Sequence, residues 1–79
     1  MKKMYLEPVD NRKSFYGKCY VVIDDNGTET LYSYDTPIMN RDPAGKLTRI
    51  WSGWSATTGR HIKAFAGLNK AAFLALPTT

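Results

Sequence analysis

The sequence is poor in the residues that carry most catalytic and metal-binding chemistry. Its 79 residues include one cysteine, Cys19, and one histidine, His61. A single cysteine excludes an intrachain disulfide framework and favours a reducing compartment. A metal centre needs several ligands close together, and no cysteine pair, second histidine or helical carboxylate lies near His61. We therefore expect no metal site and no cofactor.

Long apolar runs are also missing. The chain opens with basic residues, but Glu7, Pro8 and Asp10 soon interrupt any apolar stretch. A secretory signal or a membrane span needs an uninterrupted apolar segment, so the sequence predicts a cytoplasmic protein with no membrane partner. The hydrophobic content of 43% and aromatic content of 13% are sufficient for a packed core. We expect a single domain spanning residues 1–79.

Acidic residues are absent from the second half of the chain. All seven lie within residues 1–42, whereas residues 43–79 contain five basic residues and no acid. The formal net charge of +4 therefore arises in the second half. This asymmetry suggests an anionic partner, either nucleic acid or an acidic protein surface, although solvated surface lysines give the same pattern.

Most of the first two thirds of the chain has the pattern of antiparallel strands. Residues 15–23 are rich in aromatic and β-branched residues, and their alternation places Phe15, Gly17, Cys19, Val21 and Ile23 on the core side. Asn26-Gly27 predicts a hairpin with a type I′ turn. Pro37 removes a ladder donor, after which Ile38 and Met39 are expected to continue the second strand of this hairpin past a bulge or bend. An Asp-Pro turn over residues 40–45 follows. The expected strands cover residues 4–9, 15–23, 28–34 and 46–54.

The C-terminal part of the chain has a helical pattern. The hydroxyl residues at positions 55–58 are typical of a helix start, where they accept free backbone N–H groups. Ile62 and Phe65 then share one stripe with Ala66. Gly67 weakens the end of this helix, and Asn69 caps a short segment that Pro77 ends. The sequence leaves open whether these residues form one bent helix or two. We predict an α+β fold, in which an antiparallel β-meander of three to four strands precedes one or two C-terminal helices.

No catalytic arrangement emerges from these residues. A nucleophilic pair of Cys19 and His61 is conceivable, but a cysteine in the middle of an apolar strand face is usually a small inert hydrophobe. The serines and threonines at positions 52–58 have no evident base beside them, and strand-end and capping roles explain them. We therefore name no catalytic residue and predict that the protein is not an enzyme.

Two groups of side chains are candidates for binding. Aromatic and basic residues interleave around the expected junction of strand and helix, where they can stack bases, hold phosphates or anchor a protein interface. The two tryptophans lie three positions apart, which puts them on opposite faces of a strand, so we expect at least one at the surface. The first group is Arg49, Trp51, Trp54, Arg60, His61 and Lys63. A possible second surface, which also suits cross-strand packing or a homodimer interface, consists of Tyr16, Tyr20, Tyr32 and Tyr34.

Two short motifs resemble those of a known group of proteins. The first is Ser-Tyr-x-Thr over residues 33–36, and the second is Ser-Ala-Thr-Thr-x-Arg-His-Ile over residues 55–62. Both are similar to segments of an uncharacterised family of short proteins carried by phages and other mobile elements of bacteria. The resemblance implies no known activity and assigns no functional residue. It does imply an accessory role, since small proteins of mobile elements are often inhibitors of host defence.

The favoured hypothesis is a mobile-element protein that acts in the host cytoplasm by binding a host protein or nucleoprotein complex, as an anti-defence inhibitor of the anti-CRISPR type. The alternative is a small basic nucleic-acid-binding module. Salt dependence separates them in part, because affinity for nucleic acid falls steeply as phosphate counterions are released.

Overall fold

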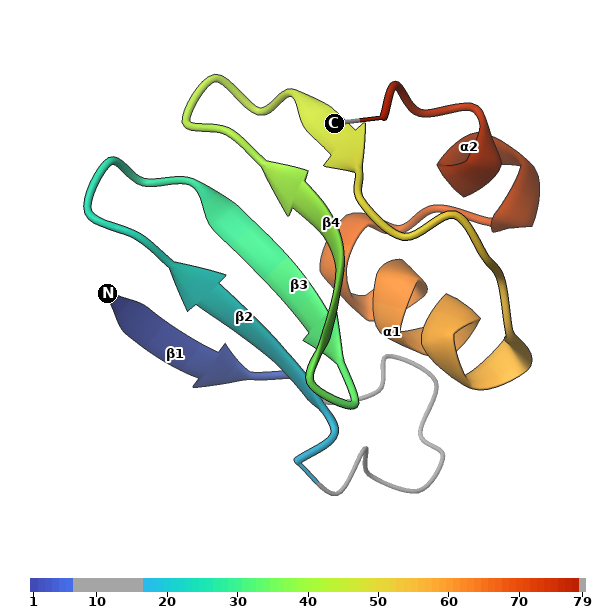
Figure 1. Cartoon of the computed structure of the whole chain (residues 1–79), viewed down its shortest axis with the longest axis horizontal. Helices are drawn as coiled ribbons and strands as arrows, with labels where there is room; N and C mark the ends of the chain where they lie inside the picture. The colour runs from blue at the N-terminus through green and yellow to red at the C-terminus, as the bar shows by residue number, and fades with distance from the viewer. Residues whose placement is uncertain (7–16, 79) are drawn as a thin grey trace.

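The computed structural model describes residues 1–6 and 17–78, which form an antiparallel sheet with helices on one of its faces (Figure 1). The strands follow one another across the sheet in sequence order. The predicted α+β meander is confirmed, but the described residues form five strands where three to four were expected. The elements are β1 (Lys2–Tyr5), β2 (Cys19–Ile23), β3 (Glu29–Ser33), β4 (Thr36–Arg41), β5 (Leu47–Arg49), α1 (Ala56–Ala66) and α2 (Lys70–Leu74).

The additional strand is β4, which the sequence analysis treated as a continuation of β3. The chain reverses through a two-residue turn at Tyr34 and Asp35, whose φ angles are 52° and 66°. Positive φ at both central residues produces the twist that suits a tight hairpin. Pro37 then pairs opposite Tyr32 at a bulge. The predicted bulge near Pro37 is confirmed, whereas the prediction that Ile38 and Met39 continue the preceding strand was wrong, because tyrosine is an unusual residue at the first position of such a turn.

Two other hairpins join neighbouring strands through three-residue loops. In the first, Gly27 N–H donates to the Asp24 carbonyl at 2.9 Å, and Gly27 has a φ of 92° while Asn26 has a negative φ. This is the pattern of a glycine bulge, so the predicted hairpin is confirmed and the predicted type I′ turn is wrong. The β4–β5 loop repeats the arrangement, with Gly45 at a φ of 91°. The predicted Asp-Pro turn is confirmed there.

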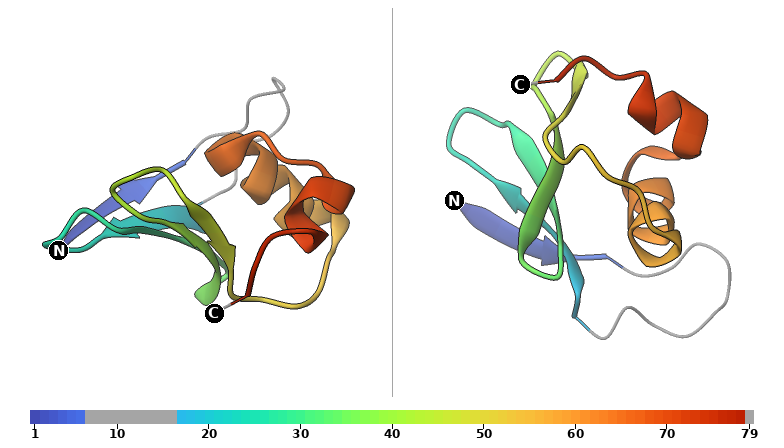
Figure 2. Two further views of the ribbon diagram at one scale, coloured as in Figure 1. Left: turned by 90° about the horizontal axis from the view of Figure 1, so that it is seen from above. Right: turned by 45° about the vertical axis from the view of Figure 1, so that its right-hand side comes forward.

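The core lies between one face of the sheet and the two helices (Figure 2). Side chains that alternate along the central strands point toward α1 and α2, which cover this face. Predictions for Cys19 and Val21 are confirmed, whereas Phe15 of the same expected face lies outside the described residues. The buried apolar cluster consists of Cys19, Val21, Leu31, Ile38, Met39, Ile62, Phe65 and Phe73.

Local capping explains why the C-terminal segment forms two helices. The Ser55 hydroxyl accepts the Thr58 N–H at 3.1 Å and begins α1. Gly67 ends α1 in a left-handed conformation with a φ of 72°, which glycine adopts without steric strain. Asn69 then caps α2 by accepting the Ala72 N–H at 2.8 Å. Neither helix is long and apolar enough to cross a membrane, and the described residues contain no other helix.

The last strand is shorter than predicted. It was expected to reach residue 54, but it stops at Arg49 because the N–H groups of Ile50 and Trp51 both turn toward the Ile38 carbonyl, at 2.8 and 2.9 Å. The chain then runs as an extended connection to α1. The C-terminal segment returns to this edge, where the Arg49 N–H donates to the Pro77 carbonyl at 2.7 Å.

Candidate binding surfaces

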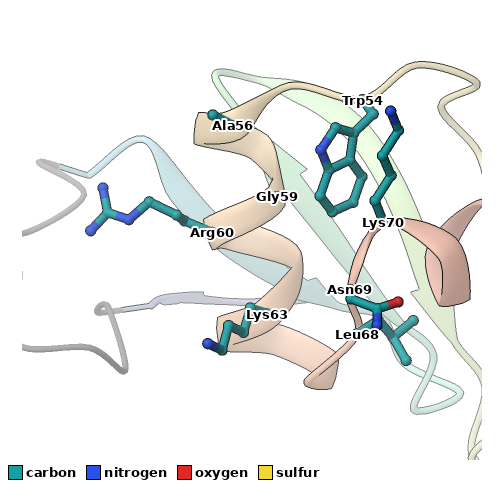
Figure 3. A pocket seen from close by; sticks show the side chains of 8 residues that line it. All are labelled: Trp54, Ala56, Gly59, Arg60, Lys63, Leu68, Asn69 and Lys70. Atoms are coloured by element: carbon teal, nitrogen blue, oxygen red, sulfur yellow. The ribbon is translucent and has the colours of Figure 1, made fainter.

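A shallow pocket of about 260 Å³ lies between α1 and the start of α2 (Figure 3). It combines an aromatic ring with several basic side chains from segments that are separate in the sequence. We call it the basic pocket. Its lining residues are Trp54, Ala56, Gly59, Arg60, Lys63, Leu68, Asn69 and Lys70.

Trp54 forms one wall of the basic pocket because α1 has a glycine where the indole approaches it. A Cβ atom on Gly59 would lie 2.5 Å from Cζ2 of Trp54, closer than real Cβ contacts allow. On the core side, the indole centroid is 5.9 Å from that of Phe73. Trp54 is thus half-buried and rests against the protein, and only part of its ring is available to a ligand.

Three basic side chains line the basic pocket, and one of them, Lys70, lies beside the indole (Figure 3). Lys63 and Lys70 are exposed, and neither side chain forms an ion pair or hydrogen bond within the part of the chain that the structure describes. Figure 3 shows Lys70 alongside Trp54, while Lys63 and Arg60 extend from α1. Because residues 43–79 contain no acid, no carboxylate of this segment offsets their charge. The basic pocket therefore favours an anionic partner.

Three predicted site residues do not line this pocket, and two of them, Arg49 and Trp51, are half-buried against the core. Arg49 is half-buried, with its guanidinium carbon 5.9 Å from the Phe73 ring centroid. Trp51 is also half-buried and covers Gly53, where a Cβ atom would lie 2.7 Å from the indole. Both tryptophans are half-buried and pack against the apolar core. Neither ring is therefore fully open to a ligand.

His61 lies in the interior and does not join the basic surface. Its side chain is 1% exposed, and its Nδ1 atom is 2.7 Å from Ser33 Oγ. Ser33 Oγ is in turn 3.2 Å from Thr58 Oγ1. Burial, with the Arg60 charge as a second cause, lowers the pKa of His61, so a neutral imidazole is favoured. A structural role in this buried polar group explains the presence of His61, which we had grouped with the surface residues.

Cys19 lies directly opposite Ser33 in the pairing of β2 with β3, next to this buried polar group. Its side chain is fully buried, and burial raises the pKa of the thiol to about 12. The thiol is therefore protonated at neutral pH and is a poor nucleophile. Within residues 1–6 and 17–78, no three side chains of histidine, cysteine, aspartate or glutamate gather as metal ligands.

A second candidate surface lies on the face of the sheet opposite the helices. Tyr20 and Tyr32 stack with ring centroids 5.1 Å apart and planes 6° apart, and Tyr5 meets Tyr20 edge-on at 5.8 Å. Lys3 Nζ lies 4.2 Å from the Tyr20 ring centroid and 5.2 Å from that of Tyr5. We call Lys3, Tyr5, Tyr20 and Tyr32 the tyrosine face.

The other predicted tyrosines do not extend this face. Tyr34 lies in the β3–β4 turn, where its ring centroid is 5.8 Å from that of His61, and Tyr16 lies outside the described residues. The turn is nevertheless linked to the tyrosine face, because the Tyr20 hydroxyl donates to Asp35 Oδ1 at 2.6 Å. This hydrogen bond, with smaller effects of burial and of the Asp35 charge, raises the pKa of Tyr20 to about 12.

Sequence reasoning missed several residues of these surfaces. Lys70 was missed although it belongs to the acid-free segment. The change of chain direction at Gly67 brings it beside Trp54, and the sequence does not specify that direction. Lys3 was missed because the first strand was placed at residues 4–9, whereas β1 begins at Lys2. Tyr5 lay within the predicted strand but was not grouped with the other tyrosines. The alternation of Lys3 and Tyr5 on one face was the available signal.

The chain belongs to a family of unknown function designated DUF8033, whose model matches residues 4–73. No curated protein and no solved structure matches the chain. Family membership therefore assigns neither an activity nor a functional residue.

Proposed function

We propose that this member of a family of unknown function acts by binding a partner protein that presents an acidic surface to the basic pocket. One observation carries the proposal: Lys63 and Lys70 line a pocket beside Trp54 and form no ion pair among the described residues. A partly accessible tryptophan is a typical anchor of a protein interface, and exposed cations beside it complement an acidic surface on a partner.

The proposal includes a biological setting. The motifs at residues 33–36 and 55–62 resemble those of phage and mobile-element proteins, which supports an accessory role in the host cytoplasm. Inhibition of a host defence complex, as by an anti-CRISPR protein, is the form of this role that we favour. A basic inhibitor acts by covering an acidic surface of its target, since it cannot imitate the negative charge of DNA.

Nucleic-acid binding is the second candidate, and the same basic pocket supports it. Base stacking requires an accessible aromatic face. Trp54 rests against Gly59 and near Phe73, and Trp51 rests against Gly53. Since both indoles are partly covered by the protein itself, the geometry favours a protein partner over a strand that stacks successive bases.

Capture from host lysate tests the proposal. The tagged chain is incubated with nuclease-treated and untreated lysates of a bacterium with active defence systems, and bound proteins are quantified. We expect a specific protein that survives nuclease treatment, together with weakened restriction of phage in cells that express the chain. Recovery that depends entirely on nucleic acid, with direct mobility shifts of DNA or RNA at moderate salt, would favour the second candidate and reject the first.

A further inference from the structure

The strand β1 forms one edge of the sheet, and its outer side has no strand neighbour among the described residues (Figure 1). It pairs with β2 alone, and all four of its residues are exposed. Met4 keeps 45% of its surface accessible and Tyr5 58%. An exposed strand edge is a template on which another extended chain can pair.

The phase of the hydrogen bonds identifies which backbone groups of β1 are available. Leu6 N–H donates to the Cys19 carbonyl at 3.0 Å. In an antiparallel pair, alternate residues bond to the same neighbour, so Met4 also bonds to β2. The N–H and C=O groups of Lys3 and Tyr5 therefore point to the open edge.

The opposite side of β2 gives the same phase independently. Asp24 N–H donates to the Thr28 carbonyl, and Tyr34 N–H donates to the Lys18 carbonyl, at 3.0 and 2.9 Å. The even-numbered residues of β2 thus bond to β3. Its odd-numbered residues, including Cys19, remain for β1, in agreement with the bond from Leu6.

We propose that the open edge of β1 binds an extended acidic segment of a partner protein, which adds a strand to the sheet. The backbone groups of Lys3 and Tyr5 supply the hydrogen bonds. Alternate side chains of the added strand lie beside the tyrosine face, and those between them lie beside Met4. Main-chain pairing provides affinity in this mode, and the flanking side chains provide specificity.

Charge selects an acidic segment as the occupant. Lys2 and Lys3 both project from β1, one on each face, and neither has an ion-pair partner in the described part of the chain. The rings of Tyr20 and Tyr5 hold the Lys3 ammonium at the edge. Asp25, the acid recorded in contact with this end of the chain, pairs instead with the terminal ammonium of Met1 at 3.1 Å. A carboxylate on the added strand therefore meets an available cation.

The same charges disfavour a second copy of this chain at the edge. Two β1 strands paired edge to edge would bring the Lys2 and Lys3 side chains of both copies together. Like charges on adjacent strands are destabilising, and lysines on an edge strand are a common means of preventing self-association. An acidic segment replaces this repulsion with attraction.

Hydrogen exchange of the full-length chain tests the proposal directly. The probe is a synthetic peptide of about eight residues that alternates glutamate and valine, and a lysine–valine peptide of equal length is the control. In the free protein, we expect protected amides at Met4 and Leu6 and rapid exchange at Lys3 and Tyr5. The glutamate peptide should slow exchange at Lys3 and Tyr5, and the lysine peptide should not.

Matched variants separate the backbone contribution from charge. Lys3→Thr removes the cation, whereas Lys3→Pro also removes the outward N–H without breaking a bond to β2. We expect Lys3→Thr to lower the affinity for the glutamate peptide and to make that affinity less dependent on salt. Lys3→Pro should lower the affinity about fivefold further. Lys46→Thr, at an exposed position outside the basic pocket and the tyrosine face, should bind the peptide as the unaltered chain does.

Three results would overturn the proposal. The first is no change in Lys3 and Tyr5 exchange at saturating peptide. The second is equal affinity of Lys3→Thr and the unaltered chain at low salt, which remains decisive if Lys3→Pro does not fold. The third is protection of these amides that rises with protein concentration alone, which assigns the edge to a second copy. Each result is distinguishable from failure of the basic pocket, because that pocket lies on other elements.

Discussion

At the scale of single residues, the structure gives His61 and Gly59 roles that composition did not indicate. His61 was grouped with the candidate binding residues because it lies among aromatic and basic residues at the expected junction of strand and helix. Its actual position is beside Ser33, a residue 28 positions away in the sequence. Periodicity predicts which side of a helix faces the core, but it does not identify the polar partner that allows a histidine to be buried there.

Burial of His61 makes stability depend on pH. The pKa of His61 is lowered in the folded protein, while in the unfolded chain the imidazole titrates near its usual pKa of about 6.5. As pH falls through about 6.5, the unfolded chain takes up a proton that the folded protein resists, so the free energy of unfolding decreases. Urea unfolding at several pH values between about 7.5 and 5.5 measures this loss.

A His61→Gln variant serves as the control for this measurement. It retains a side chain that can hydrogen bond to Ser33 but has no titrating group, so its stability should change much less over the same pH range. Equal slopes for the two proteins would show that other groups cause the dependence.

Gly59 should be intolerant of a side chain for a reason unrelated to helix propensity. Alanine is a better helix former than glycine by about 1 kcal/mol, which alone predicts stabilisation. The added Cβ would lie 2.5 Å from Trp54, however, and overpacking typically costs about 1–3 kcal/mol. We expect Gly59→Ala to lower the free energy of unfolding, as measured by urea denaturation, and to displace the indole, as measured by tryptophan fluorescence.

The cause can be isolated in a double-mutant cycle. When Trp54 is replaced by leucine, the steric conflict is relieved, and Gly59→Ala should become neutral or stabilising. A similar loss of stability in both backgrounds would contradict the close contact between the indole and α1.

At the scale of elements, the sequence predicted hairpins where turn residues are conventional and missed the one where they are not. Gly27 and Gly45 carry the positive φ angles of two loops. In the β3–β4 turn, Tyr34 and Asp35 adopt them instead, at a steric cost. Contacts distant in sequence accompany this conformation, namely the hydrogen bond from Tyr20 to Asp35 and the ring contact of Tyr34 with His61. Local patterns cannot supply that information.

The link between this turn and β2 can be measured through the tyrosine that it holds. Asp35→Asn removes the carboxylate that raises the pKa of Tyr20 to about 12, and it keeps a residue type that tolerates positive φ. We expect the pKa of Tyr20 to fall toward its usual value of about 10. Chemical shifts of ring carbon atoms, followed by NMR as pH rises, report this residue separately.

An Asp24→Asn variant is a suitable control, because it makes the same chemical change in a different loop. It should leave the titration of Tyr20 unaltered. An unchanged titration in Asp35→Asn would instead show that burial, and not the turn carboxylate, determines the ionisation of Tyr20.

At the scale of the whole molecule, the alternation, turn and helix patterns predicted an α+β meander, and the acid-free segment indicated where the basic surface would lie. These patterns could not show that the helix break at Gly67 brings Lys70 into one pocket with Trp54 and Lys63. They also could not show that Arg49 and Trp51 pack against the core. The candidate site was therefore predicted as a region and only partly as a set of residues. Its composition depends on the angle between α1 and α2, which no local pattern specifies.

The central claim is that the basic pocket binds an acidic partner protein, and paired charge reversal tests it most directly. The double variant Lys63→Glu/Lys70→Glu is compared with Lys18→Glu/Lys46→Glu, which changes the net charge equally at exposed positions outside the basic pocket. Urea unfolding first establishes that both variants remain folded, since a glutamate near the end of α1 opposes the helix dipole.

The measurement is the amount of partner protein retained from nuclease-treated host lysate by each variant and by the unaltered chain. Reversal in the basic pocket should reduce retention at least about tenfold, because two attractive contacts become repulsive, and the matched control should retain nearly the full amount. Equal retention by the two folded variants would show that net charge or another surface determines binding, and it would contradict the account.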